Sequence, residues 1–199
     1  MKKRKLGIFG HLAFVACTGA LALGLGTVHA ATVSLSPGSW QGFDVDPISA
    51  TDGSLSWINA DDGSLTSFTL TTPVAGVLKV VDLLNAGDTF NVSITGPSGT
   101  QNLTTSSVSA TSTSFVGLNG YDAALANPDF SRLLINLGAG TYTITGSLLQ
   151  SALFDGSPLN ATSGALEFTP VPLPAALPLL LSGLAGFGFA RRRRTANTI

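Results

Sequence analysis

The chain has 199 residues, of which 44% are hydrophobic and only 11% are charged. All 11 acidic residues lie between Asp44 and Glu167, where Lys79 and Arg132 are the only basic residues, so this part carries a formal charge of −9 against −1 for the whole chain. This charge argues against nucleic acid as a partner, because nucleic-acid-binding proteins present basic patches. The single Cys and both His precede residue 30, which excludes Ser-His-Asp or Cys-His catalysis, zinc sites of the His/Cys kind and disulfides from the rest of the chain.

The first 30 residues have the three parts of a secretory signal peptide. Residues 2–5 are all basic, residues 6–26 are largely apolar, and Val28-His29-Ala30 is similar to an A-x-A cleavage site. We therefore predict a signal peptide over residues 1–30, cut between Ala30 and Ala31. A lipoprotein box at Cys17 is an alternative, but the apolar segment continues well past Cys17.

Residues 31–170 are predicted to form one exported acidic domain made of β-strands. Residues 67–71, 89–95 and 141–148 alternate apolar and polar side chains and are rich in Thr and in β-branched or aromatic residues, a pattern typical of half-buried strands. Residues 74–84 are more continuously apolar, as expected of a strand that is buried on both faces or crosses between sheets. Many short strands at this spacing predict an all-β fold, an antiparallel β-sandwich or jelly roll.

Glycine-containing dipeptides mark turns between these strands, and one short helix is predicted. The turn dipeptides are Asp52-Gly53, Asp62-Gly63, Asn119-Gly120 and Asp155-Gly156. The helix is expected near Tyr121 to Ala126 and should end at Asn127-Pro128, because a residue before Pro disfavours helical geometry. Between residues 104 and 114 nearly every residue is Ser or Thr, which predicts an exposed ribbon or a loop.

Calcium is the first chemical hypothesis for this domain. Five carboxylates lie within about 20 residues, a spacing within which one Ca²⁺ could gather hard oxygen ligands; they are Asp44, Asp46, Asp52, Asp61 and Asp62. However, no segment matches an EF-hand loop, and Asp and Gly are also the usual residues of β-turns. Turn formation and surface solubility therefore remain the alternative to a calcium site, and no other cofactor is expected.

Carbohydrate binding and catalysis are two further hypotheses. Trp40 is the candidate carbohydrate contact because it lies among Gly and polar residues, whereas Trp57 and Tyr142 are expected in the core. Glu167 and any Asp could in principle supply the carboxylate pair of a glycosidase. Nothing in the sequence marks a partner for Glu167, and neither a nucleophile elbow nor a phosphate-binding loop is present, so we do not expect an enzyme.

The chain closes with a short motif, an apolar segment and a basic cluster. The motif is Val171-Pro172-Leu173-Pro174-Ala175-Ala176, and none of residues 171–190 is charged. A stretch of about 20 uncharged residues is sufficient to cross a membrane as a helix, so residues 171–194 are predicted to hold a transmembrane helix over 175–190. Basic residues favour the cytoplasmic side, which places Arg191, Arg192, Arg193 and Arg194 there, followed by a short tail over 195–199.

This closing segment resembles the VPLPA-CTERM variant of the PEP-CTERM sorting signals, which exosortases process in Gram-negative bacteria. Leu173 stands where the commoner signal has Glu. Blocks between residues 64 and 168, such as Ala86-Gly87-Asp88-Thr89-Phe90, resemble uncharacterised PEP-CTERM proteins with a β-sandwich ectodomain. The resemblance implies insertion in the inner membrane, a cut near Pro172 by an exosortase and a final place at the cell surface or outside the cell, but it supplies no catalytic residue.

The expected function is therefore structural or adhesive, in a surface or matrix protein that associates with exopolysaccharide. Two alternatives remain open from the sequence. One is a carbohydrate-binding module, and the other is an envelope protein that keeps its membrane anchor permanently.

Overall fold

The computed structural model describes residues 30–171 and Ser182. Apart from Ala30, Val171 and Ser182, the predicted signal peptide and the predicted sorting segment with its transmembrane helix lie outside these residues. Within the described part of the chain, no helix combines the length and the apolar character needed to span a membrane.

The described residues form two main β-sheets. The five-stranded sheet contains, in spatial order, β1 (Ala31–Ser34), β3 (Thr66–Thr72), β8 (Gly140–Gln150), β5 (Thr89–Gly96) and β6 (Gly99–Thr104). The four-stranded sheet contains β2 (Gln41–Val45), β11 (Thr162–Pro170), β4 (Gly76–Leu83) and β7 (Arg132–Leu137). A separate hairpin pairs β9 (Leu153–Phe154) with β10 (Ser157–Pro158).

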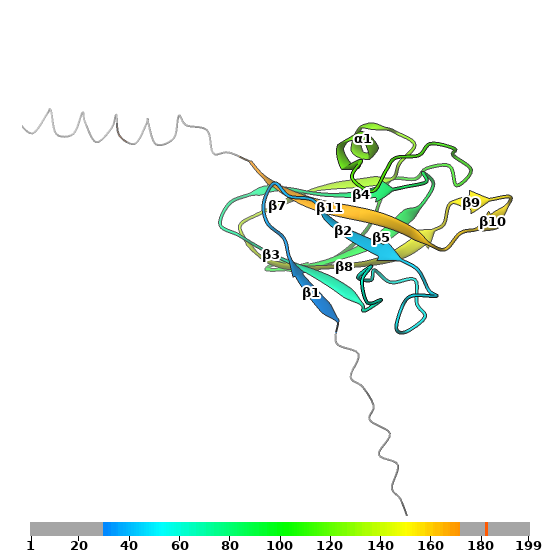
Figure 1. Cartoon of the computed structure of the whole chain (residues 1–199). Coiled ribbons are helices and arrows are strands. Elements are labelled where there is room, and N and C mark those ends of the chain that lie inside the picture. Colours follow the sequence, from blue (N-terminus) through cyan, green and yellow to red (C-terminus); the bar gives the residue numbers. More distant parts are fainter. Residues whose placement is uncertain (1–29, 172–181, 183–199) are drawn as a thin grey trace, which may run out of the picture.

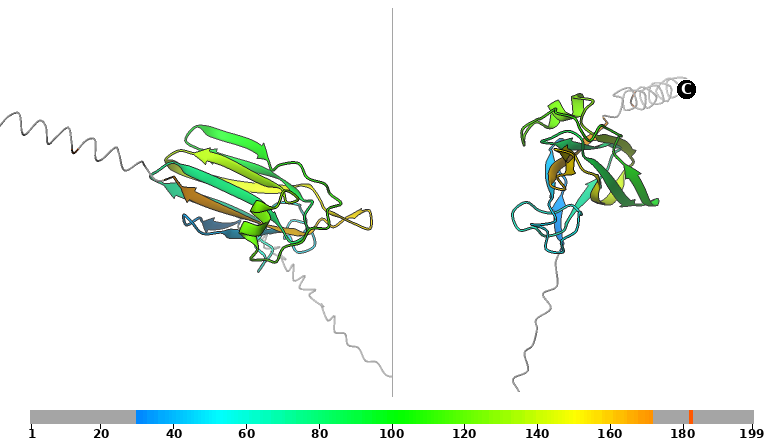
Figure 2. Two further views of the ribbon diagram at one scale, coloured as in Figure 1. Left: turned by 90° about the horizontal axis from the view of Figure 1, so that it is seen from above. Right: turned by 90° about the vertical axis from the view of Figure 1, so that its right-hand side faces the viewer.

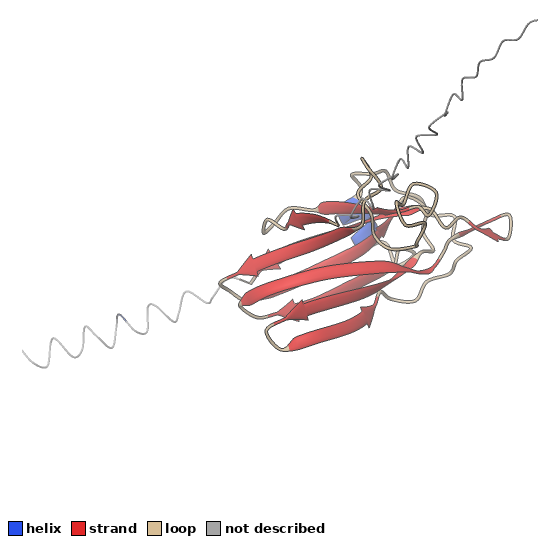
Figure 3. Ribbon diagram, turned by 90° about the horizontal axis from the view of Figure 1, so that it is seen from below, coloured by secondary structure: helices blue, strands red, loops and turns tan. Residues whose placement is uncertain are grey.

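The two sheets lie face to face as a β-sandwich (Figure 1). The short helix α1 (Tyr121–Ala126) covers the outer face of the four-stranded sheet, and the β9–β10 hairpin projects from one end (Figures 1 and 2). Figure 3 shows the strands side by side with the helix behind them. This architecture confirms the predicted all-β sandwich.

One strand pair departs from the predicted antiparallel pattern. β1 pairs with β3 in parallel, from Ala31 opposite Thr66 to Ser34 opposite Thr69, while the other strand pairs are antiparallel. The cause is the crossover between them: after β1 the chain enters the other sheet as β2 and returns for β3, so the two strands run in the same direction.

The alternating segments and the continuously apolar segment both behave as predicted. β3, β5 and β8 cover the three segments in which polar and apolar residues alternate. Residues 80–83 of β4 are all buried, because the strand is covered on two sides. Leu78 and Val80 belong to the core between the sheets, whereas Val81 and Leu83 pack under the helix with Ala124.

The centre of the core is an aromatic stack. The rings of Phe43 and Trp57 lie 3.9 Å apart between centroids at an interplanar angle of 18°, and Trp57 is 1% exposed, as expected of a core residue. Two strand glycines make room for these rings. A Cβ at Gly164 would lie 2.2 Å from the Phe43 ring, and a Cβ at Gly146 would lie 2.3 Å from the Trp57 indole. Tyr142, the other predicted core aromatic, is partly buried against the same cluster.

The predicted turns and helix agree closely with the structure. Gly53, Gly63 and Gly156 have φ values of 67°, 68° and 78°, in the left-handed region that glycine tolerates best. Gly120 instead has an ordinary φ of −83° and precedes α1. The helix ends at Ala126 because Asn127, which precedes Pro128, is extended at φ −89° and ψ 121°.

The Ser/Thr-rich segment after β6 is a loop that contacts both sheets. The Phe90 N–H donates to Thr105 Oγ1 at 2.9 Å, and Thr105 itself is 4% exposed. The next residue, Ser106, donates its N–H to the Arg132 carbonyl at the start of β7. The segment therefore links β5 to β7 across the side of the sandwich.

Candidate functional site

Trp40, the predicted carbohydrate contact, packs on the outer face of the four-stranded sheet. Its ring stacks on Tyr121 of α1 with centroids 5.5 Å apart and an interplanar angle of 16°. Lys79 Nζ lies 5.8 Å from the centroid of the same ring. Trp40 is partly buried against the residues under the helix, so its main contacts hold Tyr121 in place.

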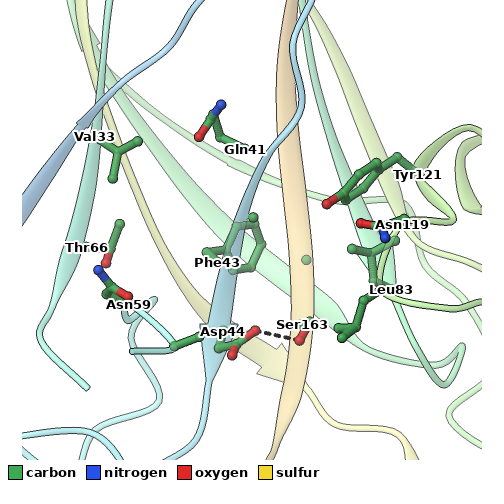
Figure 4. A pocket seen from close by; sticks show the side chains of 14 residues that line it. Val33, Gln41, Phe43, Asp44, Asn59, Thr66, Leu83, Asn119, Tyr121 and Ser163 are labelled. Atoms are coloured by element: carbon green, nitrogen blue, oxygen red, sulfur yellow. Dashed lines mark hydrogen bonds between the residues drawn. The ribbon is translucent and has the colours of Figure 1, made fainter. Parts of the chain in front are cut away.

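A hollow of about 250 Å³ lies beside this aromatic pair and is the first candidate site (Figure 4). Tyr121, Asn119 and Leu83 line one side, and Val33, Asn59 and Thr66 line the other. Between them Ser163 Oγ donates a hydrogen bond to Asp44 Oδ1 across β2 and β11. One aromatic ring, one carboxylate and several amide and hydroxyl groups give a surface that can hydrogen-bond a polar ligand.

The lining of the hollow does not contain the carboxylate pair of a glycoside hydrolase. Its lining holds one carboxylate, that of Asp44, whereas glycoside hydrolysis needs two that face the same bond. Glu167, the carboxylate that the sequence suggested for catalysis, forms an ion pair with Lys79 at 2.7 Å instead. The Lys79–Glu167 ion pair joins β4 and β11 on the outer face of the four-stranded sheet.

Replacing Lys79 with Met is expected to lower the free energy of unfolding by about 1 kcal/mol, because it leaves a partly buried Glu167 carboxylate unpaired. The side chains of Lys79 and Glu167 are only 22% and 12% exposed. Chemical denaturation at pH 7 measures the change. The double variant Lys79→Met/Glu167→Met should recover most of it, since two apolar side chains need no partner. A single variant as stable as the wild type would show that the pair contributes nothing.

The five carboxylates of the calcium hypothesis lie in local turns and at one strand end. Asp46 accepts from the Ile48 N–H and the Ser49 hydroxyl, Asp52 from the Ser54 N–H, and Asp62 from the Ser64 N–H. These bonds lower the pKa values of Asp46, Asp52 and Asp62. Asp44 is bonded to Ser163, and Asp61 donates its own N–H to Asn59.

No three acidic, His or Cys side chains converge on a common point in the part of the chain that the structure describes. Asp52, Asp61 and Asp62 are close in the sequence because they lie at two successive Asp-Gly turns, at Gly53 and Gly63, in each of which a Ser N–H donates to the Asp carboxylate. The calcium site accordingly stays a prediction.

Two buried carboxyl groups were not expected from the sequence. Asp82 is fully buried near the end of β4, and neither of its carboxyl oxygens has a hydrogen-bond partner among the described residues. Burial raises its pKa to about 9, and the charge of nearby Asp88 adds to the rise, against the opposing effect of nearby backbone N–H groups. Burial also raises the pKa of Asp88, whose Oδ1 accepts the Ala152 N–H at 2.8 Å. The signal in the sequence was the position of Asp82 inside an apolar run.

Charge is distributed unequally between the two sheets. The strands of the five-stranded sheet contain no Asp, Glu, Lys, Arg or His. The four-stranded sheet carries the charged residues found in the main strands, which are Asp44, Lys79, Asp82, Arg132 and Glu167. The outer face of the five-stranded sheet is therefore a neutral surface of Ser, Thr and Asn side chains on a domain that carries a formal charge of −9.

Comparison with known proteins adds little. The sequence matches no family model and no curated protein. Among solved structures the chain is similar to the pre-peptidase C-terminal domain of a collagenase from Bacillus anthracis, with a TM-score of 0.39 and 10% sequence identity, over 71% of this chain and 97% of that chain. A similarity this weak carries no argument about function.

The structure itself defines the class of protein, which is an all-β sandwich domain. The described chain is an all-β sandwich with one helix on its charged sheet, an uncharged polar surface on its other sheet and a small polar hollow beside Tyr121.

Proposed function

We propose that this chain is an exported, non-enzymatic protein of the cell surface or extracellular matrix, with a structural or adhesive role in association with exopolysaccharide. The observation that carries the proposal is the neutral Ser/Thr/Asn face of the five-stranded sheet. A polar surface without charge suits contact with hydroxyl-rich polymers, since both sides offer donors and acceptors and no charged group must lose its water.

Export and processing form the second part of the proposal. A signal peptide over residues 1–30 directs export, residues 175–190 cross the inner membrane, and an exosortase cuts near Pro172 in the VPLPA-type motif. The position of β11 supports this order. It is an inner strand of its sheet and ends at Pro170, so a cut just beyond it would leave every strand of the sandwich in place.

The hollow of Figure 4 favours the carbohydrate-binding module as a second candidate function. Tyr121 offers an aromatic face held by Trp40, and Asn119, Asn59 and Asp44 offer hydrogen-bonding groups around it. Sugar sites commonly combine such groups. The third candidate is a permanently anchored envelope protein. It differs from the first candidate because the residues after Pro172 would stay in the chain and would not be cut off.

Loss of the host exosortase is expected to move the protein from the extracellular matrix fraction to the inner membrane fraction, because the uncut apolar segment would remain in the bilayer. Immunoblots of the two fractions from wild-type and exosortase-deficient cells measure this shift. A periplasmic protein without a sorting segment serves as the control and should not move. An unchanged distribution in the two strains would rule out exosortase processing.

A further inference from the structure

The neutral face of the five-stranded sheet is an ordered array of hydroxyl groups. Cross-strand pairing aligns one residue from each of its five strands in a single row, which reads Ser34, Thr69, Thr143, Thr95 and Thr100. Adjacent members are spaced by the strand separation of about 4.8 Å. Thr69 is partly exposed and the other four are exposed, so the row presents a continuous line of hydroxyls to solvent.

A trough of about 480 Å³ lies on this face beside the row. Hydroxyl and amide side chains from four strands line it, namely Ser67, Asn91, Ser93, Asn102, Thr145 and Ser147. Its volume is in the range of about 300–1,000 Å³ found for small-molecule sites. No charged residue contributes to the lining, although the domain as a whole is strongly acidic.

Trp57 and Gly146 belong to the apolar part of this trough, together with Ala30, Leu65 and Val92. The Trp57 indole lies directly against Gly146, where any side chain would collide with the ring. The Trp57 Nε1–H has no hydrogen-bond partner among the described residues. Because Trp57 is only 1% exposed, its indole supports the floor of the trough from the core side, and the groups that a ligand would contact are the hydroxyl and amide side chains around it.

We propose that this trough, together with the row of hydroxyls beside it, binds a neutral polysaccharide. The inference rests on the proposed association with exopolysaccharide and assigns it to a surface. The charge of the domain favours a neutral polymer over an anionic one. A neutral polysaccharide can contact the Ser, Thr and Asn side chains without desolvating any ion, whereas an anionic polymer would be repelled by the net charge of the domain. Ala30, the residue that the predicted signal-peptide cleavage removes, also lines the trough, so cleavage would widen it.

Trp40→Phe provides a background in which the trough can be monitored alone. The chain has two tryptophans, and this substitution leaves Trp57 as the only one. The protein, purified from its host after export, is titrated with dextran, a soluble β-1,3-glucan, the neutral polysaccharide fraction of the host matrix, and polygalacturonate as an anionic comparator. We expect at least one neutral polymer to change the Trp57 emission and polygalacturonate to leave it unchanged.

Two aspartate substitutions on the same strand and the same face test the location. Thr145 lies in the trough, whereas Thr141, also exposed on β8, lies outside it. Thr145→Asp is expected to weaken binding of the neutral polymer at least tenfold, because the new charge would lose water on binding. Thr141→Asp should stay within about twofold of the parent, as expected of a surface substitution away from the site. Thermal unfolding confirms that both variants fold.

Several results would overturn the assignment to the trough. The first three are no binding to any neutral polymer, equal weakening of binding by the two aspartate substitutions, and a preference for polygalacturonate. The fourth is loss of binding in Trp40→Phe alone, which would assign the sugar to the hollow beside Tyr121. A dimer in light scattering that Thr145→Asp dissociates would make the face a self-association surface. If the protein still reaches the matrix in processed form, only the site assignment fails; if it is never exported, the proposed function fails as well.

Discussion

Replacing Asp82 with Asn is expected to raise the free energy of unfolding at pH 8 by about 2–4 kcal/mol, because the neutral amide removes the need to protonate a buried carboxyl group on folding. Asp82 is fully buried, and both of its oxygens lack partners in the described structure. With a pKa of about 9 in the folded protein, it is protonated at pH 8, whereas the same group in the unfolded chain is ionised. The Asn amide also lacks partners, which limits the gain.

The wild-type protein should therefore become less stable as the pH rises. The pKa of Asp82 is higher in the folded protein than its ordinary value of 3.8, so between these two values the folded state holds a proton that the unfolded state has released. Its contribution to stability is complete below pH 3.8 and is lost by about pH 9. The slope reaches at most about 1.4 kcal/mol per pH unit for this group. Asp88, whose pKa burial also raises, leaves part of the slope in the variant.

Urea denaturation at pH 5, 6.5 and 8 measures this effect, with Asp155→Asn as the matched control. Asp155 is exposed in the turn between β9 and β10 at φ 49°, a conformation that Asn accepts readily. The control should follow the wild-type pH profile. An Asp82→Asn variant that is less stable than the wild type at pH 8, with an unchanged pH slope, would show that the Asp82 carboxyl is ionised and partnered in solution.

Gly164→Ala is expected to cost about 2–3 kcal/mol of stability, a typical penalty for overpacking a close-packed core. The added Cβ would lie 2.2, 2.7 and 3.0 Å from three atoms of the Phe43 ring. That ring cannot retreat, because it stacks on Trp57 at 3.9 Å and makes an edge contact with Phe90 at 5.2 Å between centroids. The loss is measured as a lower denaturation midpoint with an unchanged m-value.

Gly42→Ala on the neighbouring strand β2 is the control for Gly164→Ala. A Cβ at Gly42 would meet only the Gly164 carbonyl oxygen at an ordinary 3.8 Å, so we expect a change within about 0.5 kcal/mol. Phe43→Leu should make the Gly164→Ala substitution less costly, since a smaller side chain opens space for the methyl group. Equal stabilities of the Gly164→Ala and Gly42→Ala variants would contradict the packing described for the core.

Local pattern predicted much of the fold. The alternation of Phe90, Val92 and Ile94 with polar residues was sufficient to identify β5, because the side-chain period of a strand is fixed by its geometry. The two-sided burial of β4 followed from its continuous apolar run. The helix end at Asn127 followed from the restriction that Pro128 places on the residue before it.

Features that depend on contacts between segments far apart in the sequence could not be predicted. The parallel contact of β1 with β3 joins segments that are separated by a complete crossover to the other sheet. The trough on the neutral face combines Ser67, Asn91, Asn102 and Thr145, which come from four strands. The stacking of Tyr121 on Trp40 likewise depends on how α1 packs against the four-stranded sheet. In each case the residues are visible in the sequence, but their spatial arrangement is set by the packing of distant segments.

Export followed by removal of the apolar segment can be checked by the intact mass of the protein recovered from the extracellular matrix of its host. We expect a chain that begins at Ala31 and ends between Val171 and Ala176, with the sandwich complete and the apolar segment removed. A chain that still ends at Ile199 and is found only in the inner membrane would contradict this expectation, because the segment after Pro172 would then be a lasting anchor.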